Sequence, residues 1–335
     1  MKISSQCLTD AARKTRISSI TCTLFDLFSK VLDIGSVPTR SFFEEMAAFA
    51  TIGEEKEKLL ELSSGEGTDL YWDYCVRERR NYVEILEDFK SVRPPLEKLL
   101  EHIPLVRPRH YSIASSPSEQ EDCIDLCVAV VKRRTPYRRD VMGLCSGFLA
   151  GVRPGQGVFI CIRKGILSSC KLRENMNSPA ILIGPGTGVA PMRSFLREIA
   201  TAHRDGAGQQ NTLNLMLFFG CRKMSADYLY EKEWKTFDHS EGYKWLVVDC
   251  AFSQDQQTKD YVTHRIRNRG QELWGLLQSP DCCVLVSGSA KKMPDDVKQA
   301  LKDVMKQYGG LDEAATERRL SDMMRSKHYV VEAWS

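Results

Sequence analysis

Downstream of residue 179, short apolar runs alternate with amphipathic stretches, and this alternation constrains the fold more than any other feature. The apolar runs predict strands at 180–183, 213–219, 245–250, 283–287 and 328–332. The stretches between them predict helices at about 190–203, 227–237 and 259–277, and a further helix that starts at Pro294. Strands that are separated by helices pair in parallel, with helices on both faces of the sheet. The C-terminal part of the chain is therefore predicted to be a parallel α/β domain.

The glycine-rich segment 184–191, Gly-Pro-Gly-Thr-Gly-Val-Ala-Pro, connects the first of these strands to the first helix. Open α/β sheets bind ligands at such turns, where the backbone approaches a phosphate closely. Thr187 adds a hydroxyl that can hydrogen-bond the phosphate. The segment thus predicts a phosphate or pyrophosphate site, with a plain structural turn as the alternative.

A second informative segment is 109–116, Arg-His-Tyr-Ser-Ile-Ala-Ser-Ser, which is predicted to be a strand. Arg109 and Tyr111 lie two residues apart, so a strand would place both on one face. A guanidinium suits a pyrophosphate and a phenol ring suits a flavin. Ser112 would point to the other side, where it can hydrogen-bond a ring nitrogen. Together with the glycine-rich turn, this segment indicates a flavin next to a nicotinamide nucleotide.

Upstream of the sheet, the pattern predicts two further regions. Residues 18–105 have apolar residues at helical spacing, whereas 106–172 has short β-like runs at 123–131 and 157–162, interrupted by prolines. The latter pattern is typical of an antiparallel sheet or barrel. The predicted organisation is an unassigned segment 1–20, a helical domain 21–105, a partial barrel 106–173 and the parallel α/β domain 174–335.

Three weaker candidates each have a structural alternative. Gly143-Leu144-Cys145-Ser146 precedes a predicted helix and offers N–H groups to a second pyrophosphate, or is an ordinary helix start. The group Ser253, Gln254, Lys259 and Tyr261 suits an adenosine with a 2′-phosphate, or forms a solvated loop. Trp334 either anchors the chain end by packing or stacks on a cofactor ring, and the sequence pattern does not distinguish these two roles.

Composition excludes several classes of protein. A formal net charge of +3 gives little support to nucleic-acid binding, and no apolar run approaches the length of a membrane span. The N-terminal residues lack the apolar centre of a secretory signal, although a transit peptide stays a minor alternative. The 12 cysteines form no CxxC pair, so no metal site is indicated and reduced thiols in a cytoplasmic protein are expected.

The chain resembles the FAD- and NADPH-binding half of the diflavin reductases, the group that contains NADPH–cytochrome P450 reductase. The resemblance depends on residues 109–112, 143–146, 184–191, 219–222, 251–253, 288–293 and 334–335. Within that group it is most similar to the NADPH-dependent enzymes that serve cytosolic iron–sulfur protein assembly, through residues 37–44, 103–109, 143–146 and 290–294.

This resemblance implies a fold like that of ferredoxin–NADP reductase, and it implies residue roles. Arg109, His110, Tyr111, Ser112, Gly143, Leu144, Cys145, Ser146 and Trp334 would bind FAD. Gly186, Thr187 and Arg222 would bind the phosphates of NADPH, and Ser253, Gln254, Lys259 and Tyr261 its 2′-phosphate end. Ser112, Glu332 and Trp334 would form the catalytic set, with Trp334 covering the flavin face opposite Tyr111.

The sequence also departs from the family pattern. Ser287 and Glu332 replace a cysteine and an aspartate, and Gln254 replaces an arginine, which is expected to weaken the preference for NADPH over NADH. A complete diflavin reductase also has an FMN domain and early barrel strands, which residues 1–20 cannot supply. FMN is therefore expected only on a separate domain, which would pass electrons to an anamorsin-like iron–sulfur protein. The alternatives are a truncated, non-catalytic binding form and a donor of the P450 reductase type.

Overall fold

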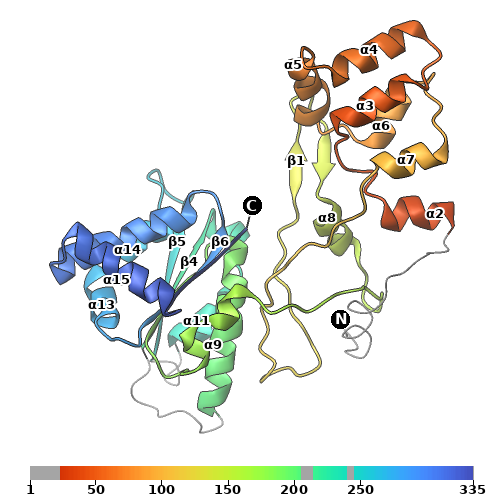
Figure 1. Ribbon diagram of the computed structural model, residues 1–335. Helices are drawn as coiled ribbons and strands as arrows, with labels where there is room; N and C mark the ends of the chain where they lie inside the picture. Colours follow the sequence, from red (N-terminus) through yellow and green to blue (C-terminus); the bar gives the residue numbers. More distant parts are fainter. Residues whose placement is uncertain (1–22, 205–213, 240–244, 335) are drawn as a thin grey trace. The chain divides into compact units, whose positions relative to one another are not determined.

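The computed structural model describes residues 23–204, 214–239 and 245–334 (Figure 1). The described chain forms two compact units. The sheet unit comprises residues 111–128 and 154–334, and the helical unit comprises residues 23–110 and 129–153. The three-domain division at residues 105 and 173 remains a prediction, and each unit is described by itself.

A parallel sheet of five strands forms the centre of the sheet unit, as the sequence predicts. Its strand order is β5-β4-β3-β6-β7, and every neighbouring pair is parallel. The strands are β3 (Ala180–Ile183), β4 (Leu215–Cys221), β5 (Leu246–Phe252), β6 (Cys283–Ser289) and β7 (Tyr329–Trp334). From β3 the chain adds β4 and β5 on one side, and it then crosses back to add β6 and β7 on the other side of β3. The point where the strand order reverses therefore lies between β3 and β6.

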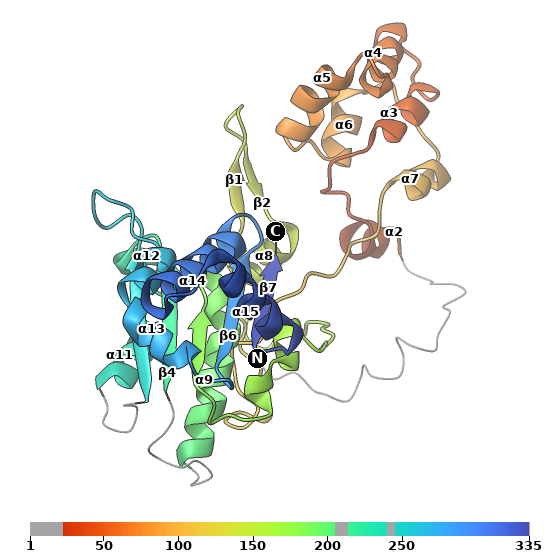
Figure 2. The same ribbon diagram turned by 60° about the vertical axis from the view of Figure 1, so that its left-hand side comes forward.

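Helices cover both faces of this sheet. Leu182 of β3 packs on α9 (Val189–Arg204) and α11 (Glu231–His239), whereas its neighbours Ile181 and Ile183 pack on the opposite face. Figure 2 shows that opposite face covered by α12 (Val262–Asn268), α13 (Gly270–Leu277), α14 (Met293–Gly309) and α15 (Glu313–Arg325). Burial on both faces explains why these strands are continuously apolar.

Helix α15 is the one long element of the sheet unit that the sequence analysis did not predict. It buries only Thr316 and Leu320 among polar neighbours, so its apolar stripe is too narrow to stand out. The side chain of Asp312 caps its start by accepting a hydrogen bond from the N–H of Ala315 at 2.7 Å. The predicted helix 259–277 is likewise divided, since α12 ends at Asn268 and α13 begins at Gly270.

The predicted β-runs between residues 106 and 162 pair much less than expected. The strand predicted at 109–116 is wrong, because only Ile113 pairs there, in an isolated bridge to Leu126. Among the described residues, 157–162 contains no paired strand and Phe159 is fully exposed. A strand needs a hydrogen-bonding neighbour, and no described segment pairs with these runs.

The helical unit confirms the helical character predicted for residues 18–105 from residue 23 onward, and residues 18–22 lie outside the described residues. It contains α2 (Leu24–Asp26), α3 (Arg40–Ala47), α4 (Gly53–Ser63), α5 (Thr68–Tyr71), α6 (Tyr82–Asp88), α7 (Leu96–His102) and π-helical turns at Leu27–Val31 and Trp72–Arg77. Phe42, Phe43 and Tyr82 centre its core. Asn81 and Glu84 begin α6 as a reciprocal capping box.

An antiparallel hairpin extends from this helical core. Its strands are β1 (Lys132–Arg134) and β2 (Asp140–Met142), followed by α8 (Leu144–Gly151). Arg139 fastens the hairpin to the core, because its guanidinium pairs with Glu84 and donates to the carbonyl oxygen of Glu78 at 2.9 Å. The hairpin and α8 therefore belong to the helical unit and not to the sheet unit.

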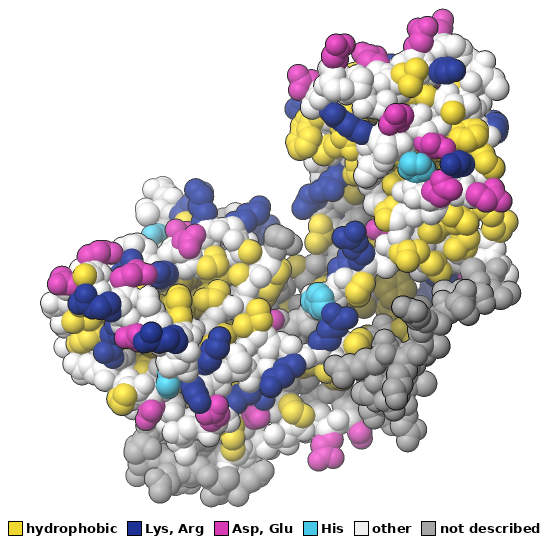
Figure 3. All heavy atoms as spheres, in the orientation of Figure 1, with side chains coloured by type: hydrophobic (Ala, Val, Ile, Leu, Met, Phe, Trp, Pro, Cys, Tyr) yellow, Lys and Arg dark blue, Asp and Glu magenta, His cyan; other side chains and the backbone are white. Residues whose placement is uncertain are grey.

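Basic and acidic side chains are mixed over the faces that Figure 3 shows, which agrees with a net charge of +3. None of the described helices combines the length and the apolar character that a membrane span requires. All ten described cysteines are free thiols.

Candidate nucleotide-binding site

The loops that follow the five parallel strands meet at one edge of the sheet. Backbone hydrogen bonds join the loops after β4 and β5, from the N–H of Ser253 to Cys221 at 2.9 Å and from the N–H of Gln254 to Arg222 at 2.8 Å. Open α/β sheets bind ligands at this edge, beside the topological switch. The sequence-predicted residues 186, 187, 222, 253, 254, 332 and 334 all lie in these loops or strand ends.

The glycine-rich turn after β3 is built for close backbone approach. A Cβ atom on Gly188 would lie 2.7 Å from the carbonyl carbon of Ser287, and one on Gly184 would lie 2.8 Å from the Cα of Val189. Gly186 has a φ of +58°, which favours glycine, and the space around its Cβ position is open. Gly184 thus lets the turn close tightly on itself and Gly188 lets it approach β6, whereas the space beside Gly186 is open.

Ser112 and Glu332, which are distant in sequence, meet at this edge. The Ser112 hydroxyl and the backbone of Leu167 lie close enough to the Glu332 carboxylate to favour its charged form, which lowers the pKa of Glu332. Burial nevertheless raises the pKa of Glu332 above its ordinary value. The carboxyl group therefore keeps its proton to a higher pH than an exposed glutamate does.

Ser287 on β6 is the register neighbour of Glu332 on β7. Its side chain is completely buried, and its Oγ has no hydrogen-bond partner among the described residues. An unpaired buried hydroxyl is costly, so this one fits a polar group of a ligand such as the carboxamide of a nicotinamide. From the sequence, Ser287 is only a departure from the family pattern. Its position near the carboxyl end of a buried strand is the signal that could have identified it as a site residue.

The two aromatic candidates, Tyr111 and Trp334, lie close in sequence to Ser112 and Glu332. Tyr111 precedes Ser112 and is partly exposed, and Trp334 is two residues beyond Glu332 with 39% of its surface exposed. The carbonyl oxygen of Trp334 accepts a hydrogen bond from the N–H of Ala290 at 2.7 Å, which fixes the end of β7. Both rings therefore remain accessible to a flat ligand.

The candidates for the adenosine end are exposed. Arg222 is paired with Asp227 at 3.0 Å, and this carboxylate raises the pKa of the guanidinium. Lys259 is exposed and has no ion-pair partner within the described part of the chain, and Tyr261 is exposed at the start of α12. Lys259 thus offers an unpaired ammonium group to a 2′-phosphate, whereas the charge of Arg222 is already balanced by Asp227.

The remaining flavin candidates lie in the helical unit. Arg109 is exposed, donates to the carbonyl oxygen of Arg107 at 2.5 Å and lies 3.9 Å from a carboxylate oxygen of Asp33. His110 is exposed as well. The boundary between the two units falls between His110 and Tyr111, so the segment 109–112 contributes to both.

The second predicted phosphate loop starts α8. Gly143 is its N-cap residue and no side chain caps the first turn, which leaves N–H groups available to an anion. The hydroxyl of Ser146 is engaged within the loop, because it accepts from the N–H of Val131 at 3.1 Å. Leu144 is exposed and Cys145 is partly exposed. The loop therefore fits a phosphate through its backbone more than through Ser146.

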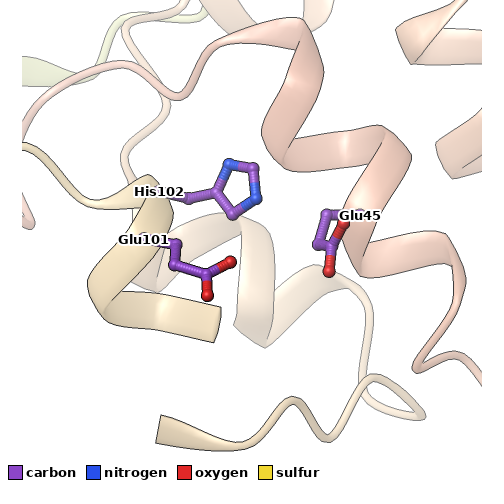
Figure 4. Close-up of side chains that lie close together, drawn as sticks. All are labelled: Glu45, Glu101 and His102. Carbon is purple, nitrogen blue, oxygen red and sulfur yellow. The ribbon is translucent and has the colours of Figure 1, made fainter. Parts of the chain in front are cut away.

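One group of possible metal ligands occurs among the described residues, Glu45, Glu101 and His102 (Figure 4). The ammonium group of Lys98 lies 3.0 Å from Glu45 and 2.9 Å from Glu101. A lysine thus already supplies the positive charge between these carboxylates, and we interpret the group as an ion-pair cluster.

Comparison with known proteins agrees with this geometry. The FAD binding domain family matches residues 7–148, and the oxidoreductase NAD-binding domain family matches residues 182–299. NADPH-dependent diflavin oxidoreductase 1 of Danio rerio is 39% identical over 319 residues, which are 94% of this chain and 51% of that protein. The chain belongs to the diflavin reductase family. It spans about half the length of the curated relatives that it matches.

Other diflavin reductases match the same portion of the chain. The Schizosaccharomyces pombe NADPH-dependent diflavin oxidoreductase 1 is 38% identical over 93% of this chain and 51% of its own length. The NADPH–cytochrome P450 reductase of Sus scrofa is 33% identical over 91% of this chain and 45% of its own length. The expected fold class and the expected FAD- and NAD(P)-binding domains are therefore confirmed.

Proposed function

We propose that this chain transfers a hydride from NADPH to FAD at the carboxyl edge of its parallel sheet. The proximity of Ser112 to the Glu332 carboxylate carries the proposal. It joins a segment within the FAD-binding match to the last strand of the nucleotide-binding sheet, next to the unpaired hydroxyl of Ser287. A hydride step needs the two rings to be held together in this way more than it needs an acid.

Each residue has a limited task in this proposal. When both nucleotides are bound, NADPH supplies a hydride at its nicotinamide and FAD accepts it at N5. Gly186 and Thr187 bind the NADPH phosphates, and Ser287 binds the carboxamide. Glu332 holds the Ser112 hydroxyl in a fixed orientation towards the flavin.

The flavin contacts in this proposal follow the family resemblance. Arg109, His110 and the backbone of 143–146 bind the FAD phosphates, while Tyr111 and Trp334 cover the two ring faces and exclude water. The exposure of Arg109 and the uncapped start of α8 support the phosphate contacts. The 2′-phosphate of NADPH is bound by Lys259 with Ser253, Gln254, Tyr261 and Arg222.

Onward transfer is part of the same proposal. Electrons would pass singly to FMN on a separate domain and then to an anamorsin-like iron–sulfur protein in the cytoplasm. The support is the similarity to relatives that are named diflavin oxidoreductases, over about half of their length.

Anaerobic titration of the purified chain tests the proposal. The chain is incubated with FAD, freed of unbound flavin and titrated with NADPH while its visible spectrum is recorded. We expect a flavin band near stoichiometry that NADPH bleaches. A colourless protein that takes up no FAD would contradict the proposal and favour a non-catalytic binding form.

A further inference from the structure

Helix α9, which begins directly after the glycine-rich turn, carries a buried arginine. Arg193 is only 7% exposed. Its Nη1 donates to the carbonyl oxygen of Ala114 at 2.8 Å and lies 3.2 Å from Asp125, and its Nε donates to Glu233 of α11 at 2.8 Å. One guanidinium thus joins the segment 111–128 to two helices of the sheet unit.

Tyr230, which precedes α11, completes the surroundings of this cation. The guanidinium carbon of Arg193 lies 4.5 Å from the centre of the Tyr230 ring. Tyr230 also lies beside Cys127 of the segment 111–128, and each of the two groups shifts the pKa of the other. Its φ of 59° is uncommon for a tyrosine and turns the ring into this position.

The residue after Arg193 adds a parallel contact. The hydroxyl of Ser194 donates to the carbonyl oxygen of Ser115 at 2.8 Å, so α9 holds two consecutive carbonyl groups of the segment. Within the segment, Asp125 accepts a hydrogen bond from the N–H of Ala114 at 2.8 Å and donates its own N–H to Ser115 at 2.9 Å. The backbone just after Ser112 is therefore fixed from two sides.

We propose that Arg193 is a positioning residue for the hydride step, acting through Ser112. It holds the segment 111–115 against α9, so that Ser112 stays in contact with Glu332 and Tyr111 stays at the carboxyl edge of the sheet. Arginine suits this task because its planar fork reaches several acceptors at fixed angles, which a lysine ammonium does not do. The inference rests on the proposed function, since Ser112 matters only if a flavin is reduced there.

The contacts also indicate that removing Arg193 leaves a foldable chain. Glu233, its most buried carboxylate partner, remains paired with Arg197 at 2.7 Å. The side chain of Asp125 is 43% exposed, so water can solvate its charge when the cation is removed. Arg193→Met therefore loosens the segment without leaving an isolated buried charge.

The experiment compares Arg193→Met, Arg193→Lys and Ser194→Ala in the full chain. The control is Arg269→Met, which removes an arginine paired with Asp249 and Glu272 on the other face of the sheet. Amide hydrogen exchange of residues 111–128 reports the anchoring. Single-turnover reduction of bound FAD by NADPH reports the consequence.

In Arg193→Met we expect the amides of Ala114 and Asp125 to exchange about tenfold faster or more. We expect the reduction rate at saturating NADPH to fall about 10- to 100-fold, with a change in the KM for NADPH below about threefold. Arg193→Lys should recover part of the rate, Ser194→Ala should show a smaller loss, and Arg269→Met should match the wild type.

Unchanged exchange in the Arg193 variants would overturn the anchoring role, and faster exchange with an unchanged rate would overturn the positioning role. If Arg193→Met does not fold, Arg193→Lys and Ser194→Ala decide by the same two readouts. A wild-type chain that binds both nucleotides without flavin reduction would instead overturn the proposed function, which the exchange data do not depend on.

Discussion

Gly188 is the position where a single methyl group should damage the carboxyl edge most. The Cβ of Gly188→Ala would overlap the carbonyl oxygen of Ser287 and would lie 2.7 Å from its carbonyl carbon, well inside the 3.4 Å at which ordinary van der Waals contact begins. The obstacle is backbone on β6, so no side-chain rotation relieves it. Overpacking of this kind costs about 1–3 kcal/mol. For a unit of this size, that loss lowers the Tm by roughly 2–12 °C.

Thermal unfolding measures this loss, and the chain supplies a matched control. Gly275 lies in α13, is exposed, and has no atom within 4 Å of its Cβ position. Gly275→Ala should therefore stabilise the chain by up to about 1 kcal/mol through helix propensity. A Gly188→Ala variant with the Tm of the wild type or of Gly275→Ala would refute the close approach between the turn and β6.

Three further predictions concern single side chains. Because burial raises the folded pKa of Glu332, its contribution to stability is greatest below the unfolded pKa and is lost as pH rises through the folded pKa. When the pH is raised from about 4 to 8, the Tm of Glu332→Gln should therefore fall less, relative to its value at pH 4, than the Tm of the wild type. An equal fall in both proteins would contradict the raised pKa of Glu332. Gln254→Arg should raise the NADPH-to-NADH preference in ferricyanide reduction by roughly 10- to 140-fold through a charged hydrogen bond of about 1.5–3 kcal/mol, and an unchanged ratio would refute that idea. Ser146→Ala should lower the free energy of unfolding in urea by about 0.5–1.5 kcal/mol, because the N–H of Val131 loses its partner, whereas the exposed Ser169→Ala should stay within about 0.5 kcal/mol; equal values would contradict the role of Ser146.

The parallel sheet was predictable because its signal is local. Each strand is a short apolar run, and the helices between them have clear apolar stripes, so periodicity and glycine positions determine the order. Helix α15 was not predicted, because it buries only Thr316 and Leu320. A narrow stripe among charged residues has the same pattern as a solvated loop.

The region 106–173 was harder because strand pairing there is not a local property. The runs at 123–131 and 157–162 have the composition of strands, but only a neighbouring strand turns such a run into a sheet. The sequence also gave no sign that residue 110 separates two units, because Arg109 and Tyr111 read as members of one strand.

The individual residues of the candidate site were predictable, but the contacts between them were not. The glycine-rich turn and Ser112 were identified from residue type and position. The meeting of Ser112 with Glu332, and the anchoring of Ala114 by Arg193, depend on contacts across long stretches of chain. The one available signal was two arginines, Arg193 and Arg197, which lie four residues apart and therefore on the same face of the predicted helix.

The most direct test of the account is rapid anaerobic mixing of the FAD-loaded chain with NADPH carrying hydrogen or deuterium at the transferring carbon, for the wild type and Ser112→Ala. We predict that deuterium slows flavin reduction in the wild type. We also predict that Ser112→Ala lowers the rate at saturating NADPH by about tenfold or more, because the hydroxyl acts on the reacting ring. A Ser112→Ala chain that reduces its flavin at the wild-type rate would contradict the central claim that the contact between Ser112 and Glu332 marks the site of hydride transfer.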